Sequence, residues 1–304
     1  MAIIFTLLFT AISFAQSRLG VHRVALILVN FQDKPTQLYD PAFAAIVASH
    51  AGSFYSANSY GATSLSTDVF GWFTISESVT TCNFKRIASK AQAAAGINPQ
   101  NYQHLVYAFP LDQACGARGN STIGGSPSQS WINVDILDWR ILAHELGHGF
   151  GLYHSHGLDC GDLILATKCS VDEYGDHFDV MGLGFSMDNH FNAAQKSRLG
   201  WITPILAGPG TYTLSPYQQV GAALQILKDS KNVYFVEYRP YQNGVLIHQA
   251  SVSDGNKIYV LDDTPLDSWD NVALVVGQTF TDGKVSITLL SADASGGATV
   301  SVKP

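Results

Sequence analysis

The 304-residue sequence has little charge. Only 13% of its residues are charged, and 17 basic side chains face 24 acidic ones, for a net charge of −7. No cluster of Lys and Arg is present. Because binding to a phosphate backbone needs such clusters, the composition argues against a nucleic-acid partner. A basic amphipathic stretch of the kind that lies on membrane surfaces is also missing. The chain is 46% hydrophobic and long enough for one large domain or two modest ones.

Long hydrophobic runs are missing too, except at the N-terminus. Residues 2–15 (AIIFTLLFTAISFA) are almost wholly apolar, but a helix that spans a bilayer takes about 20 such residues. We therefore predict no stable membrane insertion. With Ser13-Phe14-Ala15 as a small-residue cleavage site, residues 1–15 are typical of a signal peptide, although no Lys or Arg precedes the apolar core. A buried strand or a mis-assigned start codon is the alternative. Export predicts a secreted, extracellular protein.

Cysteine is sparse, and no C-x-x-C spacing occurs. The four cysteines are Cys82, Cys115, Cys160 and Cys169. An even number without that spacing suits disulfides better than a thiolate metal site. Of the three possible connectivities we favour Cys160–Cys169 as a local loop closure, with Cys82–Cys115 as the longer tie. Four buried free thiols are the alternative.

Periodicity and turn residues predict a mixture of helices and strands. Strands are expected at residues 22–31 and 102–109, with one or two more within 62–77. Helices are expected at residues 41–58, 82–95, 138–152 and 192–199, the third with Asp138 as its N-cap. The Gly/Ser-rich stretch 117–129 and the irregular stretch 155–179 are expected to be loops. Short strands between turns over residues 211–304 predict an antiparallel sandwich or barrel.

One segment of the third predicted helix contains candidate metal-binding and catalytic residues. It reads His144-Glu145-Leu146-Gly147-His148, the pattern H-E-x-x-H. Because a helix advances 3.6 residues per turn, His144 and His148 lie on one face and can bind a single ion. Zinc accepts imidazole nitrogens at about 2.0–2.1 Å. Glu145, next to the first histidine, is placed to act as a base toward water without binding the metal.

The pattern continues to His154 as H-E-x-x-H-x-x-G-x-x-H. On an uninterrupted helix His154 would lie on another face, but Gly151 permits a positive φ, so the chain can turn back to the metal. Three protein ligands leave a fourth position for water, which marks a catalytic site rather than a structural one. An ordinary core helix is the alternative, although burying three imidazoles without a metal costs desolvation at each. The sequence thus predicts one Zn²⁺ held by His144, His148 and His154.

The full pattern resembles that of the metzincin metallopeptidases, which also carry a methionine turn beneath the metal. Asp179-Val180-Met181-Gly182 is similar to that turn, and a plain core position for Met181 is the alternative. Within the metzincins the chain is most similar to the gametolysin (autolysin-type) family. Four further segments carry this resemblance: VALILVNFQD (24–33), SYG (59–61), YGDHFDVMG (174–182) and FNAAQKSRLGW (191–201). With VYFVEYRPYQNGVLIH (233–248), it covers about residues 22–250.

The resemblance implies an α+β fold. A metzincin-like catalytic domain, with a mixed five-stranded sheet and an active-site helix, is expected over residues 16–203. An antiparallel β-rich, sandwich-like domain is expected over residues 204–304. The resemblance further implies that an extended substrate binds along the edge of the first sheet.

The chain departs from some metzincins at one position. Those relatives have a tyrosine two residues after the turn methionine, where it stabilises an oxyanion, and this chain has Leu183. That role is therefore empty or filled from elsewhere. His177 and His190 are conceivable hydrogen-bond donors to the oxyanion, but we interpret both as ordinary surface or core histidines.

The acidic residues after the third histidine raise the question of calcium. They are Asp159, Asp162, Asp172, Asp176 and Asp179. Calcium prefers several oxygens from a defined loop, and no EF-hand pattern is present. We therefore expect a solvated acidic loop, with calcium possible but unsupported and no organic cofactor.

These observations predict a secreted zinc-dependent endopeptidase of the metzincin type, with Glu145 as general base. Its partners would be protein or peptide substrates, which include extracellular-matrix or cell-wall proteins as candidates. The alternative is a catalytically silent binding or adhesion module on a peptidase frame. The intact Glu145 argues against that alternative, because a silent protein has no need of the base.

Overall fold

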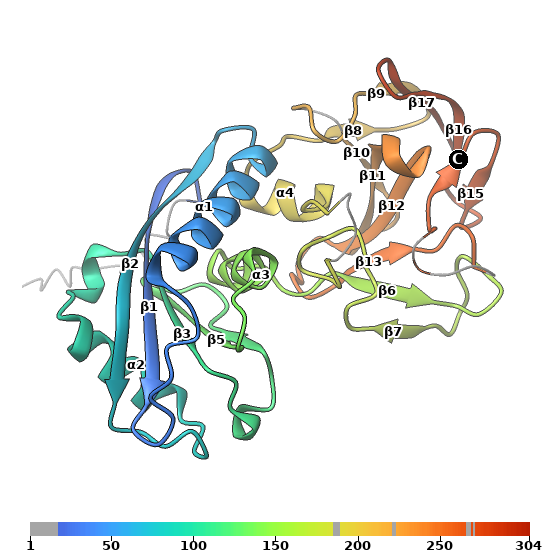
Figure 1. Ribbon diagram of the computed structural model, residues 1–304. Coiled ribbons are helices and arrows are strands. Elements are labelled where there is room, and N and C mark those ends of the chain that lie inside the picture. The colour runs from blue at the N-terminus through green and yellow to red at the C-terminus, as the bar shows by residue number, and fades with distance from the viewer. Residues whose placement is uncertain (1–17, 185–188, 221–222, 266–268, 270) are drawn as a thin grey trace, which may run out of the picture.

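A computed structural model describes residues 18–184, 189–220, 223–265, 269 and 271–304. The segment predicted to be a signal peptide, residues 1–15, lies outside the described residues. Figure 1 shows two regions side by side: a sheet flanked by helices, drawn in blue and green, and a group of strands drawn in yellow to red. Helix α3 lies between them in this view.

The first region is built on a five-stranded sheet of order β2-β1-β3-β5-β4. Its strands are β1 (Gly20–Phe31), β2 (Thr63–Ile75), β3 (His104–Phe109), β4 (Gly119–Ser121) and β5 (Ser128–Asn133). β1, β2, β3 and β5 pair in parallel, whereas the edge strand β4 runs antiparallel to β5. The expected mixed five-stranded sheet is therefore confirmed.

Helices cover both faces of this sheet (Figure 1). Alternate residues of β1 point to opposite faces. Val24, Leu26 and Leu28 share a core with α1 (Pro41–Asn58) and α3 (Trp139–Gly149). The residues between them, 25, 27 and 29, share a second core with α2 (Phe84–Ala95). Burial on both faces explains why β1 reads as an unbroken apolar run.

The second region contains two sheets. An eight-stranded sheet has the order β7-β6-β13-β12-β11-β10-β8, with β14 paired to β12, and a four-stranded sheet has the order β15-β16-β17-β9. The bounds are β6 (His156–Asp159), β7 (Ser170–Asp172), β8 (Ile205–Ala207), β9 (Gly210–Leu214), β10 (Ala223–Leu227), β11 (Asn232–Arg239), β12 (Gly244–Ser251), β13 (Ile258–Leu261), β14 (Leu274–Val275), β15 (Thr279–Thr281), β16 (Ser286–Asp293) and β17 (Gly297–Lys303). One buried apolar cluster draws side chains from both sheets, so they pack against each other. Helix α4 (Ala193–Leu199) packs on the larger sheet.

The α+β class is confirmed, but several local expectations were wrong. The stretch 117–129, expected to be a loop, contains β4 and the start of β5. The stretch 155–179 contains β6 and β7, and β6 pairs in parallel with β13, about 100 residues later. Both stretches are short and Gly- or Asp-rich, so their strand character comes from tertiary pairing and not from local propensity. Helix α3 ends at Gly149, three residues before the expected end, because the chain turns toward His154.

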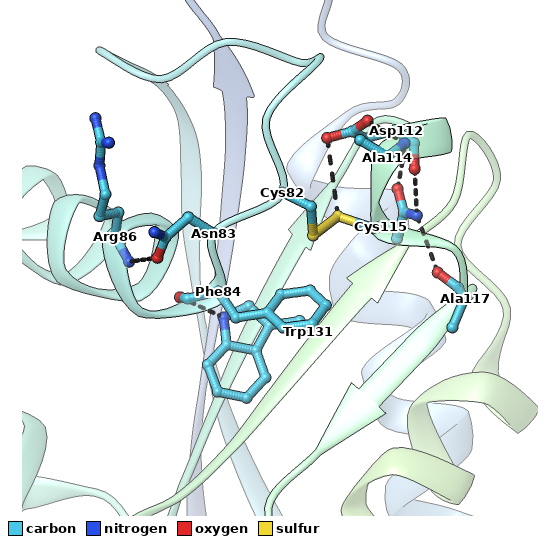
Figure 2. Close-up of a disulfide and its surroundings, with 10 residues drawn as sticks. Cys82, Asn83, Phe84, Arg86, Asp112, Ala114, Cys115, Ala117 and Trp131 are labelled. Atoms are coloured by element: carbon cyan, nitrogen blue, oxygen red, sulfur yellow. Dashed lines mark hydrogen bonds between the residues drawn. A yellow bond between two sulfur atoms is a disulfide. The ribbon is translucent and has the colours of Figure 1, made fainter.

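Both disulfides are present in the pairing that the sequence favours, Cys82–Cys115 and Cys160–Cys169. The first joins the start of α2 to the loop before β4 (Figure 2). In the same view Asn83 accepts a hydrogen bond from the backbone N–H of Arg86, and the Trp131 indole donates to the carbonyl of Phe84. None of the helices in the described part of the chain is long and apolar enough to cross a membrane.

Candidate metal centre

Helix α3 positions two of the three predicted ligands. The side chain of Asp138 caps the helix by accepting a hydrogen bond from the N–H of Arg140 at 2.7 Å. One turn apart, His144 and His148 have ring centroids separated by 4.8 Å. The helical spacing thus brings these two imidazoles together, as the sequence indicates.

The chain then reverses at Gly151, whose φ is +95°. Its N–H donates to the carbonyl of His148 at 2.8 Å, which closes the turn. Such a φ is strained for any residue with a Cβ, so glycine suits this position. After the turn, the ring centroid of His154 lies 4.9 Å from that of His148 and 5.3 Å from that of His144.

The three histidines form a cluster that can hold a metal ion. One ligand nitrogen from each lies within 4.8 Å of the others, and no other such group occurs among the described residues. The Nε2 atoms of His148 and His154 are 3.2 Å apart. Two nitrogens bound at about 2.0–2.1 Å to one tetrahedral zinc are about 3.3–3.4 Å apart, so the spacing fits.

Hydrogen bonds on the far side of each ring decide which nitrogen faces the cluster. The Nδ1 of His144 contacts the carbonyl of Val180 at 2.7 Å, and that of His148 contacts the carbonyl of Leu152 at 2.9 Å. The Nδ1 of His154 contacts a carboxylate oxygen of Glu173 at 2.5 Å. A carbonyl or carboxylate can only accept, so each Nδ1 is the donor.

In a neutral imidazole whose Nδ1 carries the proton, Nε2 is an acceptor. The lone pairs of His148 and His154 would then face each other at 3.2 Å. A cation between them removes this repulsion, and outer partners of this kind orient the histidine ligands of metal sites. Burial lowers the pKa of His144 to about 3 and that of His148 to about 4, so both rings are neutral near pH 7. The donor set therefore fits zinc.

Glu145 lies beside the cluster without belonging to it. Its side chain is buried, and the Ser121 hydroxyl donates to its Oε2 at 2.5 Å. Burial raises the pKa of Glu145 to about 7, although the Ser121 hydrogen bond opposes the shift. A Cβ at Gly119 would lie 1.9 Å from Oε1 of Glu145, so a larger residue at this position of the edge strand would displace the carboxylate. Neither Gly119 nor Ser121 of β4 could be identified from the spacing of residues in the sequence.

Met181 is fully buried directly beneath α3. A Cβ at Gly147 would lie 2.3 Å from its sulfur. The backbone N–H of Met181 donates to Asp179, and its carbonyl accepts from the N–H of Ser155, the residue after the third histidine. The turn at Met181 therefore connects α3 to the chain that carries His154.

The expectation of a solvated acidic loop was wrong for Asp176 and Asp179, which are fully buried. One oxygen of Asp176 accepts hydrogen bonds from Nε2 of His248 at 2.9 Å and from the hydroxyl of Ser155 at 2.8 Å. His248 belongs to β12, so a strand of the second region holds the segment that carries the third ligand. Burial alone would raise the pKa of Asp176, but His248 and the hydrogen bonds outweigh it and lower it to about 2.

A cavity of about 300 Å³ opens beside the cluster, lined by His144 and Glu145. Tyr174 also lines it, with its ring centroid 4.4 Å from that of His154. Neither His177 nor His190, the donors considered from sequence, lines this cavity. His156 points elsewhere, toward the backbone of Asn256. Nothing in the spacing of the sequence identified Tyr174, Glu173 or His248, because they reach the site through tertiary contacts.

Comparison with known proteins gives one family. A family model described as gametolysin peptidase M11 matches residues 44–229, a range that includes all three histidines, Glu145 and Met181. No curated protein matches the chain.

Among solved structures, two examples show a weak structural similarity to this chain. A chaperone–substrate complex is 15% identical with a TM-score of 0.35, over 56% of this chain and 32% of that one. Metalloproteinase-II from Bacteroides fragilis is 12% identical with a TM-score of 0.36, over 59% of this chain and 52% of that one. The chain thus spans about a third and about half of their lengths.

Proposed function

The chain belongs to the gametolysin peptidase family M11, and from this premise we propose that it is a zinc-dependent metalloendopeptidase of the metzincin type. The observation that carries the proposal is the convergence of three Nε2 acceptors, each fixed by a partner at Nδ1. His144, His148 and His154 would hold the metal, with Met181 beneath it. Gly151 supplies the turn that the third ligand requires.

The residues around the cluster account for the reaction. When bound, zinc supplies a positive charge that polarises the scissile carbonyl and makes water more acidic. Glu145 takes the proton from the attacking water and delivers it to the leaving amine. Ser121 orients the Glu145 carboxylate through its hydrogen bond. Because Glu145 is buried, few water molecules compete for this position.

We further propose that the protein is secreted and acts on protein or peptide substrates, with extracellular-matrix or cell-wall proteins as candidates. The two disulfides support export, since such bonds persist in oxidising compartments. We keep the division into residues 16–203 and 204–304 as a proposal, with β6 and β7 of the first part completing the large sheet of the second. The signal peptide at residues 1–15 likewise stays a prediction.

The test is Glu145→Gln, compared with His154→Ala. The amide keeps the shape of the side chain but cannot take up a proton at neutral pH. We expect peptide cleavage to fall by at least about a hundredfold, with about one zinc per chain retained. His154→Ala should lose both metal and cleavage, because it removes a direct ligand. Elemental analysis and a peptide-library assay, with and without a chelator, measure both properties.

Asp162→Asn is the matched control, because it removes an exposed carboxylate of the same chain and should change neither property. Cleavage by Glu145→Gln at the parent rate would show that Glu145 is not the base. If the parent binds zinc yet cleaves nothing in the library, the silent binding module is the better account.

A further inference from the structure

The cavity beside the candidate metal centre is lined by positively charged side chains, although the protein as a whole is negatively charged. The net charge of the chain is −7, yet two arginines, Arg118 and Arg140, line this cavity. Apart from Glu145, no carboxylate is part of the lining. Because His144 and Glu145 form one wall, a side chain in this cavity belongs to a residue next to the reacting bond.

Among the described residues, the one carboxylate paired with either arginine is Asp138, which lies 3.7 Å from Arg140. This ion pair is weak, because the two side chains are 36% and 44% exposed. The Nε of Arg140 is buried and has no hydrogen-bond acceptor. Arg118 has no ion pair or side-chain hydrogen bond within the described part of the chain. A buried donor without an acceptor is costly, so an acceptor supplied by a ligand would satisfy it.

The backbone next to Arg118 and the side chain of Arg140 are both held in place. The loop before Arg118 is tied by Cys82–Cys115 (Figure 2), and Asn133 donates a hydrogen bond to the carbonyl of Ala117 at 2.9 Å. Arg140 lies in the first turn of α3 and stacks over the Trp139 ring at 4.7 Å. The Arg140 guanidinium, held in this way, loses less entropy when it binds a carboxylate, whereas the exposed side chain of Arg118 can turn toward the same group.

Apart from Tyr174, the remaining side chains of the lining are apolar, with Ile141 from α3, Val180 from the methionine turn and Leu183 directly after it. A side chain with an aliphatic stem and an anionic end matches both parts of the cavity. Glutamate fits this description best, and aspartate has a shorter stem.

We propose that this cavity selects an acidic side chain, glutamate before aspartate, at one of the two residues flanking the cleaved bond. The proposal rests on the proposed peptidase function. Arg118 and Arg140 bind the substrate carboxylate, and Ile141, Val180 and Leu183 contact its stem. The natural substrates are then proteins with exposed acidic segments, which the acidic surface of the enzyme would otherwise repel.

The first experiment measures cleavage of decapeptides in which only the two central residues vary, each among Glu, Gln, Lys and Leu. We expect the parent to prefer Glu over Gln at one central position by about tenfold or more in kcat/KM, because charge-assisted hydrogen bonds are involved. Arg118→Gln and Arg140→Gln should each reduce the preference, and the double variant should abolish it. Arg140→Lys keeps the charge without the planar fork and should retain part of it.

The second experiment measures binding without turnover. Dye-labelled versions of the same decapeptides are titrated against the zinc-loaded Glu145→Gln protein by fluorescence polarisation. The Glu peptide should bind about tenfold more tightly than its Gln twin, and the difference should vanish when both arginines are replaced. Arg23→Gln is the matched control. Arg23 is a partly exposed arginine of the five-stranded sheet, and it does not line the cavity.

The outcomes separate this proposal from the function on which it rests. If the parent cleaves Glu and Gln peptides with equal kcat/KM, or prefers Lys or Leu, the proposed acidic preference is wrong, whereas the proposed peptidase function still holds. A parent that cleaves nothing overturns the peptidase, while the binding titration still decides the cavity. If the arginine variants fail to fold, the comparison of Glu, Gln and Lys peptides on the parent protein alone remains decisive.

Discussion

Helix α3 and the loop segment that follows it, residues 151–184, hold the two parts of the candidate metal centre by different means. α3 contributes His144, Glu145 and His148 through a regular helical spacing and its own N-cap. The loop segment contributes His154 and relies on partners distant in sequence, such as β13 for β6 and His248 for Asp176. The helical part is therefore specified locally, whereas the loop part depends on the second region.

The largest effect should come from separating the loop segment from that second region. In His248→Ala, the buried Asp176 loses its ion-pair partner, and we expect about 3–5 kcal/mol of destabilisation. Denaturant unfolding measures the loss. Hydrogen exchange should rise in the loop segment more than in α3. His50→Ala, which removes an exposed histidine of α1, is the control.

The same ion pair predicts a pH dependence. Burial lowers the pKa of His248, but the Asp176 charge outweighs burial and raises it above the ordinary 6.5. The contribution of His248 is therefore complete below pH 6.5 and lost as the pH rises through its folded pKa. The Asp176 contribution is present above pH 3.8 and lost as the pH falls toward about 2. The cost of His248→Ala should be greatest between these limits, and a cost independent of pH would contradict the ion pair.

A smaller effect is expected where α3 contacts the loop segment. In Gly147→Ala the new methyl would meet the Met181 sulfur at 2.3 Å, so Met181 must move. Overpacking of this kind costs about 1–3 kcal/mol. Gly52→Ala in α1 is the matched control, because its methyl would have 3.8 Å of clearance and alanine favours a helix. Equal melting temperatures for the two variants would show that the contact tolerates the methyl group.

The smallest effect should follow Glu173→Gln, which weakens the acceptor at His154 without touching α3. Loss of such an outer partner lowers metal affinity by about 10–100-fold. Because 58% of the Glu173 side chain is exposed, we expect about tenfold. Competition with a chromogenic chelator measures it. If Asp162→Asn in the same segment gives an equal drop, loss of charge, not loss of ring orientation, is the cause.

Most of the helical part of the site could be predicted from residue order. The spacing of His144 and His148, the position of Glu145 between them and the glycine at 151 are local features, and the first two follow from helix geometry. The α1 helix and the Asp138 cap could also be predicted from the sequence, because the composition of a helix and its capping residue are signals contained within a short stretch of chain.

Residue order alone was enough to predict the three clustered histidines, the α+β class and the cysteine pairs. The three-dimensional arrangement was needed to show that Glu173 orients His154, that Ser121 and Gly119 enclose Glu145, and that Asp176 is buried against His248. It also decided that Arg118 and Arg140 share one cavity. These contacts join residues 19 to 72 positions apart, so tertiary packing and not local periodicity brings them together.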